Sequence, residues 1–314
     1  MTEINKKQSH RNQCGVGNKY KMRHTTRLPN KGIHRSAYAA GDACRYAGIR
    51  TMTFLYQYHK HLDYALDTIA NKRLYFCAPS DFNDPFDCRP KFSLLFCRNE
   101  PEDVWRRYFF LLARHQYPDI SDEEARKHAD AALLKGKHRD KQWLREADEE
   151  NRKALNDTFL RICCFSKSPR NAMMWAHYAD NHKGVVLQFK ESYMHDNGAS
   201  YRGFDVEYYR QPIPLKRYVK AMEETERGDV TAFARLIYCS KSYEWQTEEE
   251  VRFFSQKTYV PYSETMLTGI LFGSESTVHW QDHIYTALST WASKPIFFKE
   301  DSSISSTKLR FKRA

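Results

Sequence analysis

The sequence predicts an α+β protein with a split, mainly antiparallel sheet. Short runs of apolar and aromatic residues, typical of strands, recur from residue 51 onward. Loops separate these runs and long helical patterns are few, which favours this class. In a chain of 314 residues, a hydrophobic share of 41% is enough for a sizeable core. We therefore expect one domain over residues 51–314.

This domain is expected to open with a strand, a helix and a second strand. Residues 52–58 form a compact aromatic run, and residues 74–78 form another strand-like run. Between them, apolar residues from Leu62 to Ile69 recur at the i, i+3, i+4, i+7 spacing of one helix face.

Residues 101–159 have a different composition, rich in Glu, Arg, Lys, Ala and Leu. Ser121 followed by Glu124 is a capping-box signature for the start of a helix, and Gly136 is placed to end that helix. The stretch predicts two or three helices. It is short and highly charged, so we interpret it as a helical insertion or lid within the single domain.

The strand pattern returns at residue 160. Strands are expected at residues 160–166, 185–189, 205–209, 251–254, 269–273 and 295–298. Helices are expected at about residues 171–180, 215–238 and 276–291.

Residues 1–50 are interpreted as a separate basic, flexible extension. They contain eleven Lys or Arg against two acidic residues, a net charge of +9, whereas the whole chain carries +11. Such a segment is either a solvated tail or an electrostatic handle for RNA or DNA. A third reading is that Met52 is the true start of the protein.

The eight cysteines show no CxxC pair and no zinc-type spacing with histidine, and several stand in apolar runs. This pattern predicts a cytoplasmic protein without disulfides or a structural metal. No apolar run reaches the length of a membrane span, and the start of the sequence has no signal-peptide pattern.

Two early motifs are candidates for ligand contacts. In the first strand, alternation places Tyr56 and Tyr58 on one face and Gln57 on the other. In the run FNDPFD, Asn83 and Asp84 precede a proline, which favours a rigid turn. Core packing and an ordinary turn are the alternative readings.

The third motif, MMWAHYADNHKGV, begins at Met173 and reads as a helix followed by its C-terminal turn. Trp175, His177 and Tyr178 place two aromatic rings beside an imidazole. These residues are candidate ligand contacts, although a helical histidine is often only a core or surface group.

The fourth motif, WQTEEEVRFF, is the most specific. If it is a strand, Glu248, Glu250 and Arg252 project from one face and Glu249 from the other. A guanidinium can hold one carboxylate ionised while the second faces a ligand. A solvated charged strand is the alternative.

Taken in this order, the four motifs resemble the bacterial family called domain of unknown function 2971. The matching features are LYQY, FNDPFD, CFS followed by MMWAHYADNHKGV, and the segment from Lys241 through WQTEEEVRFF. The resemblance runs from about Phe54 to Phe298 and leaves the basic extension uncovered. The family name states no activity.

A more distant resemblance is to ADP-ribosyltransferases, including toxins and phage-defence effectors. It implies an ADP-ribosyltransferase-like sheet and NAD as the substrate. Tyr56, Gln57 and Tyr58 match the first strand of those enzymes, although Gln57 stands where a His or Arg is expected. The resemblance makes Glu250 the principal catalytic residue and Glu248 its reserve. The resemblance implies contacts to NAD from these residues: Tyr56, Gln57, Tyr58, Asn83, Asp84, Trp175, His177, Tyr178 and Arg252.

The leading hypothesis is therefore a mono-ADP-ribosyltransferase-like toxin or defence effector. NAD would donate ADP-ribose to RNA, DNA or a protein, and the resemblance implies a partner antitoxin. The alternative is a non-catalytic module that binds a nucleotide or nucleic acid. A metal-dependent nuclease is a distant third, because the carboxylates lack recognisable metal-ligand spacing.

Overall fold

The computed structural model describes residues 53–82, 87, 93–156, 160–191, 203–229, 231–302 and 309–314. Residues 1–50 lie outside this part, so the prediction of a flexible basic extension stays a prediction. Asn83 and Asp84 also lie outside the described residues.

Within the described part, eight strands form one open sheet in the order β12-β11-β10-β4-β1-β3-β8-β5. Only β10 and β11 pair in parallel, so the α+β class and the mainly antiparallel sheet are confirmed. The strands of this sheet are β1 (Phe54–His59), β3 (Arg161–Ser166), β4 (Val185–Lys190), β5 (Gly203–Asp205), β8 (Glu250–Ser255), β10 (Leu267–Phe272), β11 (Ile296–Glu300) and β12 (Phe311–Arg313).

The sheet is joined by few residue pairs in its middle, between β1 and β3. Strand β1 pairs with β4 along its whole length, from Phe54 to His59. With β3, its register is given by one pair, Tyr56 and Ser166, among the described residues. The sheet therefore has two halves that meet between β1 and β3.

Two shorter ribbons lie beside the main sheet. β2 (Arg73–Tyr75) pairs with β9 (Tyr259–Pro261), and β6 (Glu207–Tyr209) pairs with β7 (Ser240–Ser242). The second strand predicted from the sequence therefore belongs to a ribbon, not to the main sheet. The expected single strand 205–209 is wrong, because the chain breaks at Val206 into β5 and β6.

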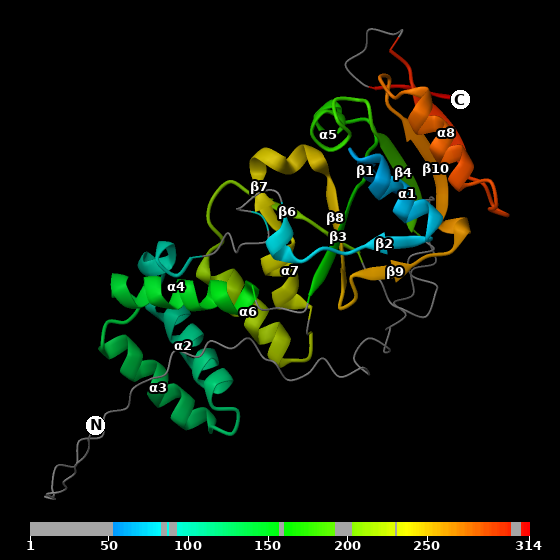
Figure 1. The fold of residues 1–314 in the computed structure, drawn as a ribbon. Helices are drawn as coiled ribbons and strands as arrows, with labels where there is room; N and C mark the ends of the chain where they lie inside the picture. The colour runs from blue at the N-terminus through cyan, green and yellow to red at the C-terminus, as the bar shows by residue number, and fades with distance from the viewer. Residues whose placement is uncertain are drawn as a thin grey trace, which may run out of the picture.

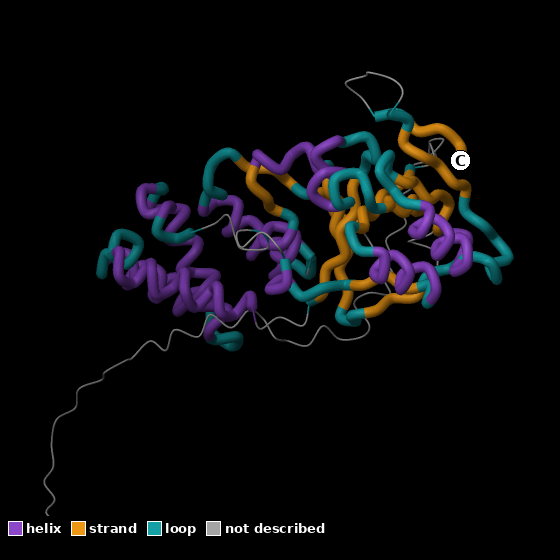
Figure 2. Tube along the Cα trace, turned by 45° about the horizontal axis from the view of Figure 1, so that its top comes forward, coloured by secondary structure: helices purple, strands orange, loops and turns teal. Residues whose placement is uncertain are grey.

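Each face of the sheet is covered by different helices (Figures 1 and 2). One face packs on α1 (Leu62–Ala70) and α8 (Val278–Ala287) through residues such as Ala65, Ile69 and Ile284. The other face carries Tyr56 and Tyr58 and packs on the indole of Trp175 in α5 (Ala172–Tyr178).

The remaining helices form a separate layer, at the left of Figure 1. They are α2 (Glu102–Gln116), α3 (Asp122–Leu134), α4 (Lys141–Asn156), α6 (Leu215–Glu226) and α7 (Ala232–Tyr238). The capping box is present, since Ser121 and Glu124 bond each other's backbone amides. Gly136 has a φ of +65°, as a residue that ends a helix often does.

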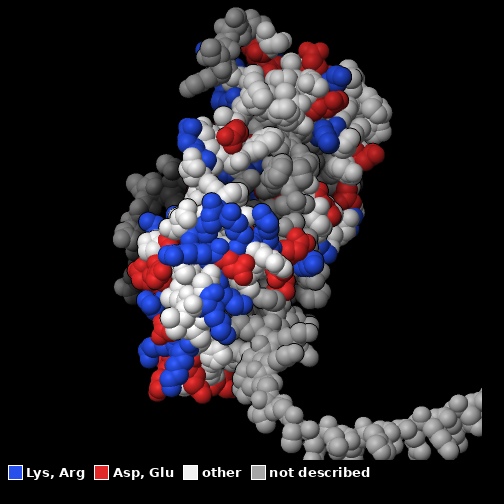
Figure 3. All heavy atoms as spheres, turned by 90° about the vertical axis from the view of Figure 1, so that its left-hand side faces the viewer, with Lys and Arg blue, Asp and Glu red and all other residues white. Residues whose placement is uncertain are grey.

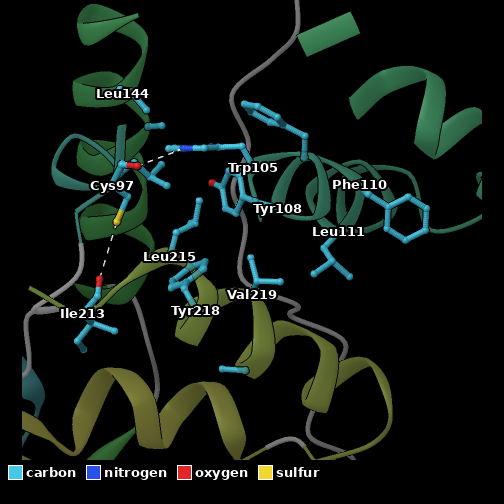
Figure 4. Packing of buried hydrophobic residues seen from close by; sticks show 14 of the residues in the cluster. Cys97, Trp105, Tyr108, Phe110, Leu111, Leu144, Ile213, Leu215, Tyr218 and Val219 are labelled. Atoms are coloured by element: carbon cyan, nitrogen blue, oxygen red, sulfur yellow. Dashed lines mark hydrogen bonds between the residues drawn. The ribbon is translucent and has the colours of Figure 1, made fainter. Parts of the chain in front are cut away.

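The helices of residues 101–159 share an apolar core with α6 and α7. Trp105 and Tyr108 of α2 pack with Tyr218 of α6, and the indole Nε1 donates to the carbonyl of Cys97 at 3.2 Å (Figure 4). Residues 101–159 therefore do not bury their apolar side chains alone, because α6 and α7 contribute part of this core.

The outer end of the helical layer is charged with both signs. Figure 3 shows a group of basic side chains near the middle of this face, with acidic and basic side chains mixed around it. Exposed ion pairs such as Arg106 with Asp130 and Arg139 with Glu102 account for part of this mixture. Such a surface is typical of solvated helices.

Short 3₁₀ segments complete the described chain: η1 (Pro79–Asp81), η2 (Phe96–Asn99), η4 (Tyr243–Glu248) and η5 (Glu264–Met266). No helix in the described ranges is long and apolar enough to cross a lipid bilayer. The cysteines of the described part, Cys77, Cys97, Cys163, Cys164 and Cys239, are free thiols.

Candidate functional site

Five charged side chains form a buried cluster where β8 begins. Glu250 and Arg252 come from β8, Glu248 from the end of η4, Lys241 from β7, and Asp87 from the segment that follows β2. Their exposed fractions lie between 0% for Arg252 and 7% for Glu250. Burying so much charge is unfavourable unless every group is paired, so the contacts within the cluster decide its chemistry.

Arg252 lies at the centre and is fully buried. Its Nε and Nη2 donate to the two carboxylate oxygens of Glu250 at 2.7 and 2.8 Å, a bidentate pair. Nη2 also donates to Oδ2 of Asp87 at 2.7 Å, and Nη1 donates to the carbonyl of Tyr238 at 2.7 Å. This last bond joins β8 to the end of helix α7.

Lys241 contacts all three carboxylates of the cluster. Its Nζ lies 2.6 Å from Oε2 of Glu248, 3.1 Å from Oδ2 of Asp87 and 3.3 Å from Oε2 of Glu250. An ammonium has three protons, and each has a carboxylate acceptor here. Lys241 therefore holds the two glutamates of the E-x-E motif side by side.

The pKa values of the two glutamates shift in opposite directions. Burial opposes ionisation of Glu250, but the cations of Arg252 and Lys241 outweigh it and lower its pKa to about 2. Burial raises the pKa of Glu248, Lys241 only partly offsets this, and the negative charge of Glu250 adds to the rise. Burial favours neutral Lys241, yet the three carboxylates raise its pKa. Glu250 is thus the fixed anion, and Glu248 is the carboxylate most ready to take a proton.

Tyr178 and Trp245 border the cluster on its more exposed side. The hydroxyl of Tyr178 donates to Oε1 of Glu248 at 2.9 Å, and the Tyr178 side chain is half-buried. Nζ of Lys241 lies 5.2 Å from the ring centre of Trp245, within cation–π range. Tyr178 therefore links the buried carboxylate of Glu248 to the more exposed side of the cluster.

Helix α5 places Tyr178. Asn171 caps its N-terminus, with Oδ1 accepting from the amide of Met173 at 2.9 Å, and its Nδ2 donates to the carbonyl of Thr247 in η4. Trp175 is fully buried, and its Nε1 donates to the carbonyl of Pro169 at 2.7 Å. In this structure the indole anchors α5, so contact with a ligand stays a prediction.

The turn after α5 is held in an uncommon backbone conformation. Asp180, Asn181 and His182 all have positive φ, between 47° and 66°, which is unfavourable for residues with a side chain. The ring of His182 stacks on Trp175, and its Nδ1 lies 2.8 Å from Oε2 of Glu300. These contacts fix the path from α5 into β4.

Sheet register brings Tyr56 to the same face as Glu250. Tyr56 of β1 is opposite Ser166 of β3, and Ser166 is opposite Glu250 of β8. Directly paired residues point to one face, and two strand spacings amount to about 10 Å. Tyr58 lies on this face too, and its hydroxyl donates to the carbonyl of Ser168 at 2.9 Å.

Gln57 points to the opposite face of β1 from Tyr56 and Tyr58, as the alternation predicted. There its Nε2 lies 3.4 Å from Sγ of Cys163 and its Oε1 lies 3.2 Å from Nε2 of His59. The expected contact of Gln57 with NAD stays a prediction. His177 is exposed, and its ring lies 6.5 Å from that of Trp245.

The expectation that Glu248 and Glu250 share one strand is also wrong. Strand β8 begins at Glu250, Glu248 ends the η4 turn, and Glu249 between them has a left-handed φ of 47°. The turn nevertheless brings both carboxylates to Lys241. Glu249 is exposed.

Asp87 and Lys241 were not among the predicted site residues. Both lie inside motifs that carried the family resemblance, FNDPFD and the segment beginning at Lys241. Electrostatics could have indicated both residues. Glu248, Glu250 and Arg252 lie close together in the sequence, and charged groups that are buried need further charged partners. No group of three or more His, Cys, Asp or Glu in the described part has the arrangement of a metal site.

The fold and the cluster define an α+β protein with a buried pair of glutamates, Glu248 and Glu250, at the start of strand β8. Lys241 and Arg252 hold this pair. The family model described as protein of unknown function DUF2971 matches residues 174–253. This match confirms the family resemblance over a segment that contains Tyr178, Lys241, Glu248, Glu250 and Arg252. No curated protein and no solved structure matches the chain.

Proposed function

We propose that this protein breaks the bond between nicotinamide and ribose in NAD and transfers ADP-ribose to a nucleic acid or a protein. The observation that carries the proposal is that Glu248 and Glu250 both contact Lys241, while their pKa values shift in opposite directions. Two carboxylates whose pKa values lie apart are the arrangement that divides electrostatic and acid–base work between them.

Each glutamate has a separate role in this reaction. Cleavage develops positive charge on the ribose, similar to the charge that develops in glycoside hydrolysis, and the ionised Glu250 stabilises it. Glu248 accepts the proton of the attacking acceptor group, with Tyr178 bonded to its other oxygen. Asp87, Lys241 and Arg252 position these carboxylates.

The net charge of the cluster and the aromatic face of the sheet both support this proposal. Three carboxylates face two cations, so the cluster carries excess negative charge when all are ionised. Tyr56 and Tyr58 extend the same sheet face with aromatic surface, and the narrow join between β1 and β3 supports an ADP-ribosyltransferase-like sheet. The toxin role and an antitoxin partner remain part of this proposal.

A second candidate is a non-catalytic binding module. One observation favours it: the described partners of the cluster are mostly its own members, with the main-chain carbonyl of Tyr238, a pattern also found in structural ion networks. NAD binding without nicotinamide release would select this candidate.

The test measures nicotinamide release from NAD by the purified full chain, with and without RNA, DNA and protein acceptors. Glu250→Gln preserves shape but removes the anion, so we expect turnover to fall about a hundredfold or more while NAD binding persists. Glu248→Gln should reduce transfer to the acceptor more than NAD cleavage.

Glu249→Gln is the matched control, since Glu249 is adjacent in sequence but exposed. It should leave activity unchanged, and circular dichroism should show that all three variants are folded. Full nicotinamide release by a folded Glu250→Gln protein would refute the assignment.

A further inference from the structure

An exposed aromatic pair lies on the ribbon formed by β2 and β9. Tyr75 and Tyr259 are directly opposite in the register, with 48% and 44% of their surfaces exposed. Their neighbours Leu74 and Val260 point inward and are buried in the core of the main sheet. The ribbon is therefore anchored by one face and presents two tyrosine rings on the other.

The two rings and an arginine form one ordered surface, which we call the tyrosine face (Arg73, Tyr75 and Tyr259). The ring centres are 5.6 Å apart, and the guanidinium of Arg73 lies 3.8 Å from the centre of the Tyr259 ring. Asp67 holds that guanidinium through two contacts, at 2.6 and 3.1 Å. The face is thus fixed before any partner arrives, which lowers the entropy cost of binding.

Cations near the tyrosine face favour a polyanionic partner. Lys257 is exposed two residues before Tyr259, in the turn between β8 and β9. Burial raises the pKa of Tyr75, Cys77 and Asp81 add to this rise, and Arg161 opposes it.

We propose that the tyrosine face binds single-stranded nucleic acid. Bases stack on aromatic rings and on guanidinium planes, and the neighbouring cations contact phosphates. A duplex keeps its bases stacked internally and cannot offer them to these rings. The partner is therefore unpaired RNA or DNA, bound without strong sequence preference.

The face is connected to the charged cluster by a short length of chain. Seven residues separate Tyr75 from Phe82, a span of about 25 Å at most when extended. The guanidinium of Arg252 lies 5.2 Å from the ring centre of Phe82. The segment that follows Tyr75 thus contacts the cluster at Phe82. A strand bound on the face is a candidate acceptor for the reaction at Glu248 and Glu250. Its role as the acceptor rests on the proposed function, whereas binding to the face does not.

The experiment measures the binding of a short fluorescein-labelled single-stranded RNA, its DNA counterpart and the matching duplex by fluorescence anisotropy. The full chain is used at about 0.3 M salt, which suppresses the electrostatic contribution of other basic segments. Tyr75→Ala and Tyr259→Ala should each weaken single-strand binding by at least about fivefold, because each removes one stacking surface. Tyr75→Phe should retain affinity, since stacking needs the ring and not the hydroxyl.

Tyr117→Ala is the control, because Tyr117 is similarly exposed, at 46%, but lies at the end of α2. It should leave binding unchanged. Equal affinity of the folded alanine variants and the parent chain would overturn the proposal, as would equal preference for duplex and single strand. Nicotinamide release in the presence of RNA, DNA and protein acceptors is measured in parallel: its absence with the parent chain refutes the proposed function and leaves the binding result intact.

Discussion

Replacing Lys241 with methionine should strongly destabilise the fold. The ammonium contacts Glu248, Asp87 and Glu250 at 2.6, 3.1 and 3.3 Å in a fully enclosed setting. Without it, three carboxylates share the single guanidinium of Arg252. Removing one partner of a buried ion pair costs about 3–5 kcal/mol, so we expect Lys241→Met to lower the free energy of unfolding by that amount.

A second substitution should partly rescue the first. Glu248→Gln alone should cost about 1 kcal/mol, because a glutamine oxygen still accepts from Lys241 while the charge-assisted part of that bond is lost. In the Lys241→Met background the same change removes an uncompensated charge. We therefore expect the double variant to be more stable than Lys241→Met by about 1–2 kcal/mol.

The assay is urea unfolding at neutral pH, followed by far-UV circular dichroism and by tryptophan fluorescence. Linear extrapolation gives the free energies, provided that the dependence on urea is the same in each variant. Lys167→Met is the control, since Lys167 pairs with Asp205 at the surface and should lose less than about 1 kcal/mol. A double variant less stable than Lys241→Met would refute the reasoning.

Three further predictions concern the scaffold. Burial lowers the pKa of His59 to about 4, below the 6.5 of an unfolded histidine. Above about pH 6.5 this group contributes no pH dependence, and as the pH falls toward 4 only the unfolded state gains the proton. Unfolding free energy should therefore drop by about 3 kcal/mol across that window, and His59→Gln should reduce the slope in urea titrations. Gly184→Ala would place its Cβ 2.2 Å from the carbonyl of His59, so we expect a loss of roughly 3 kcal/mol; an unchanged melting temperature would contradict this. Ser121→Ala removes the capping box of α3 and should cost about 1 kcal/mol, with faster amide exchange in α3 and recovery in Ser121→Asp.

A helix was predictable where the sequence marks its first and last residues as well as its periodic pattern. Helix α3 is an example, because Ser121, Glu124 and Gly136 mark both ends within the segment itself. Strands β1, β3, β4 and β10 were predictable from short apolar runs that the core requires.

The errors came from contacts between segments distant in sequence. The run 205–209 alternates like one strand, but the amide of Val206 bonds the carbonyl of Glu250 and turns the chain into a second ribbon. Glu248 also fits the alternation of a strand. In the structure it is the last residue of η4, and the left-handed Glu249 separates it from β8. Asp87 could be assigned only from its partner Arg252, which is 165 residues further along the chain.

The bond between Arg252 and Asp87 also bears on what constitutes a folding unit. The family match begins at residue 174, so it contains Arg252 but neither Asp87 nor strand β3, against which β8 pairs. Expressed by itself, residues 174–253 would present a guanidinium stripped of one carboxylate and a strand with one open edge, and it should aggregate or remain unfolded. The family segment therefore contains only part of the charged cluster, and we expect a folding unit that reaches back at least as far as Asp87.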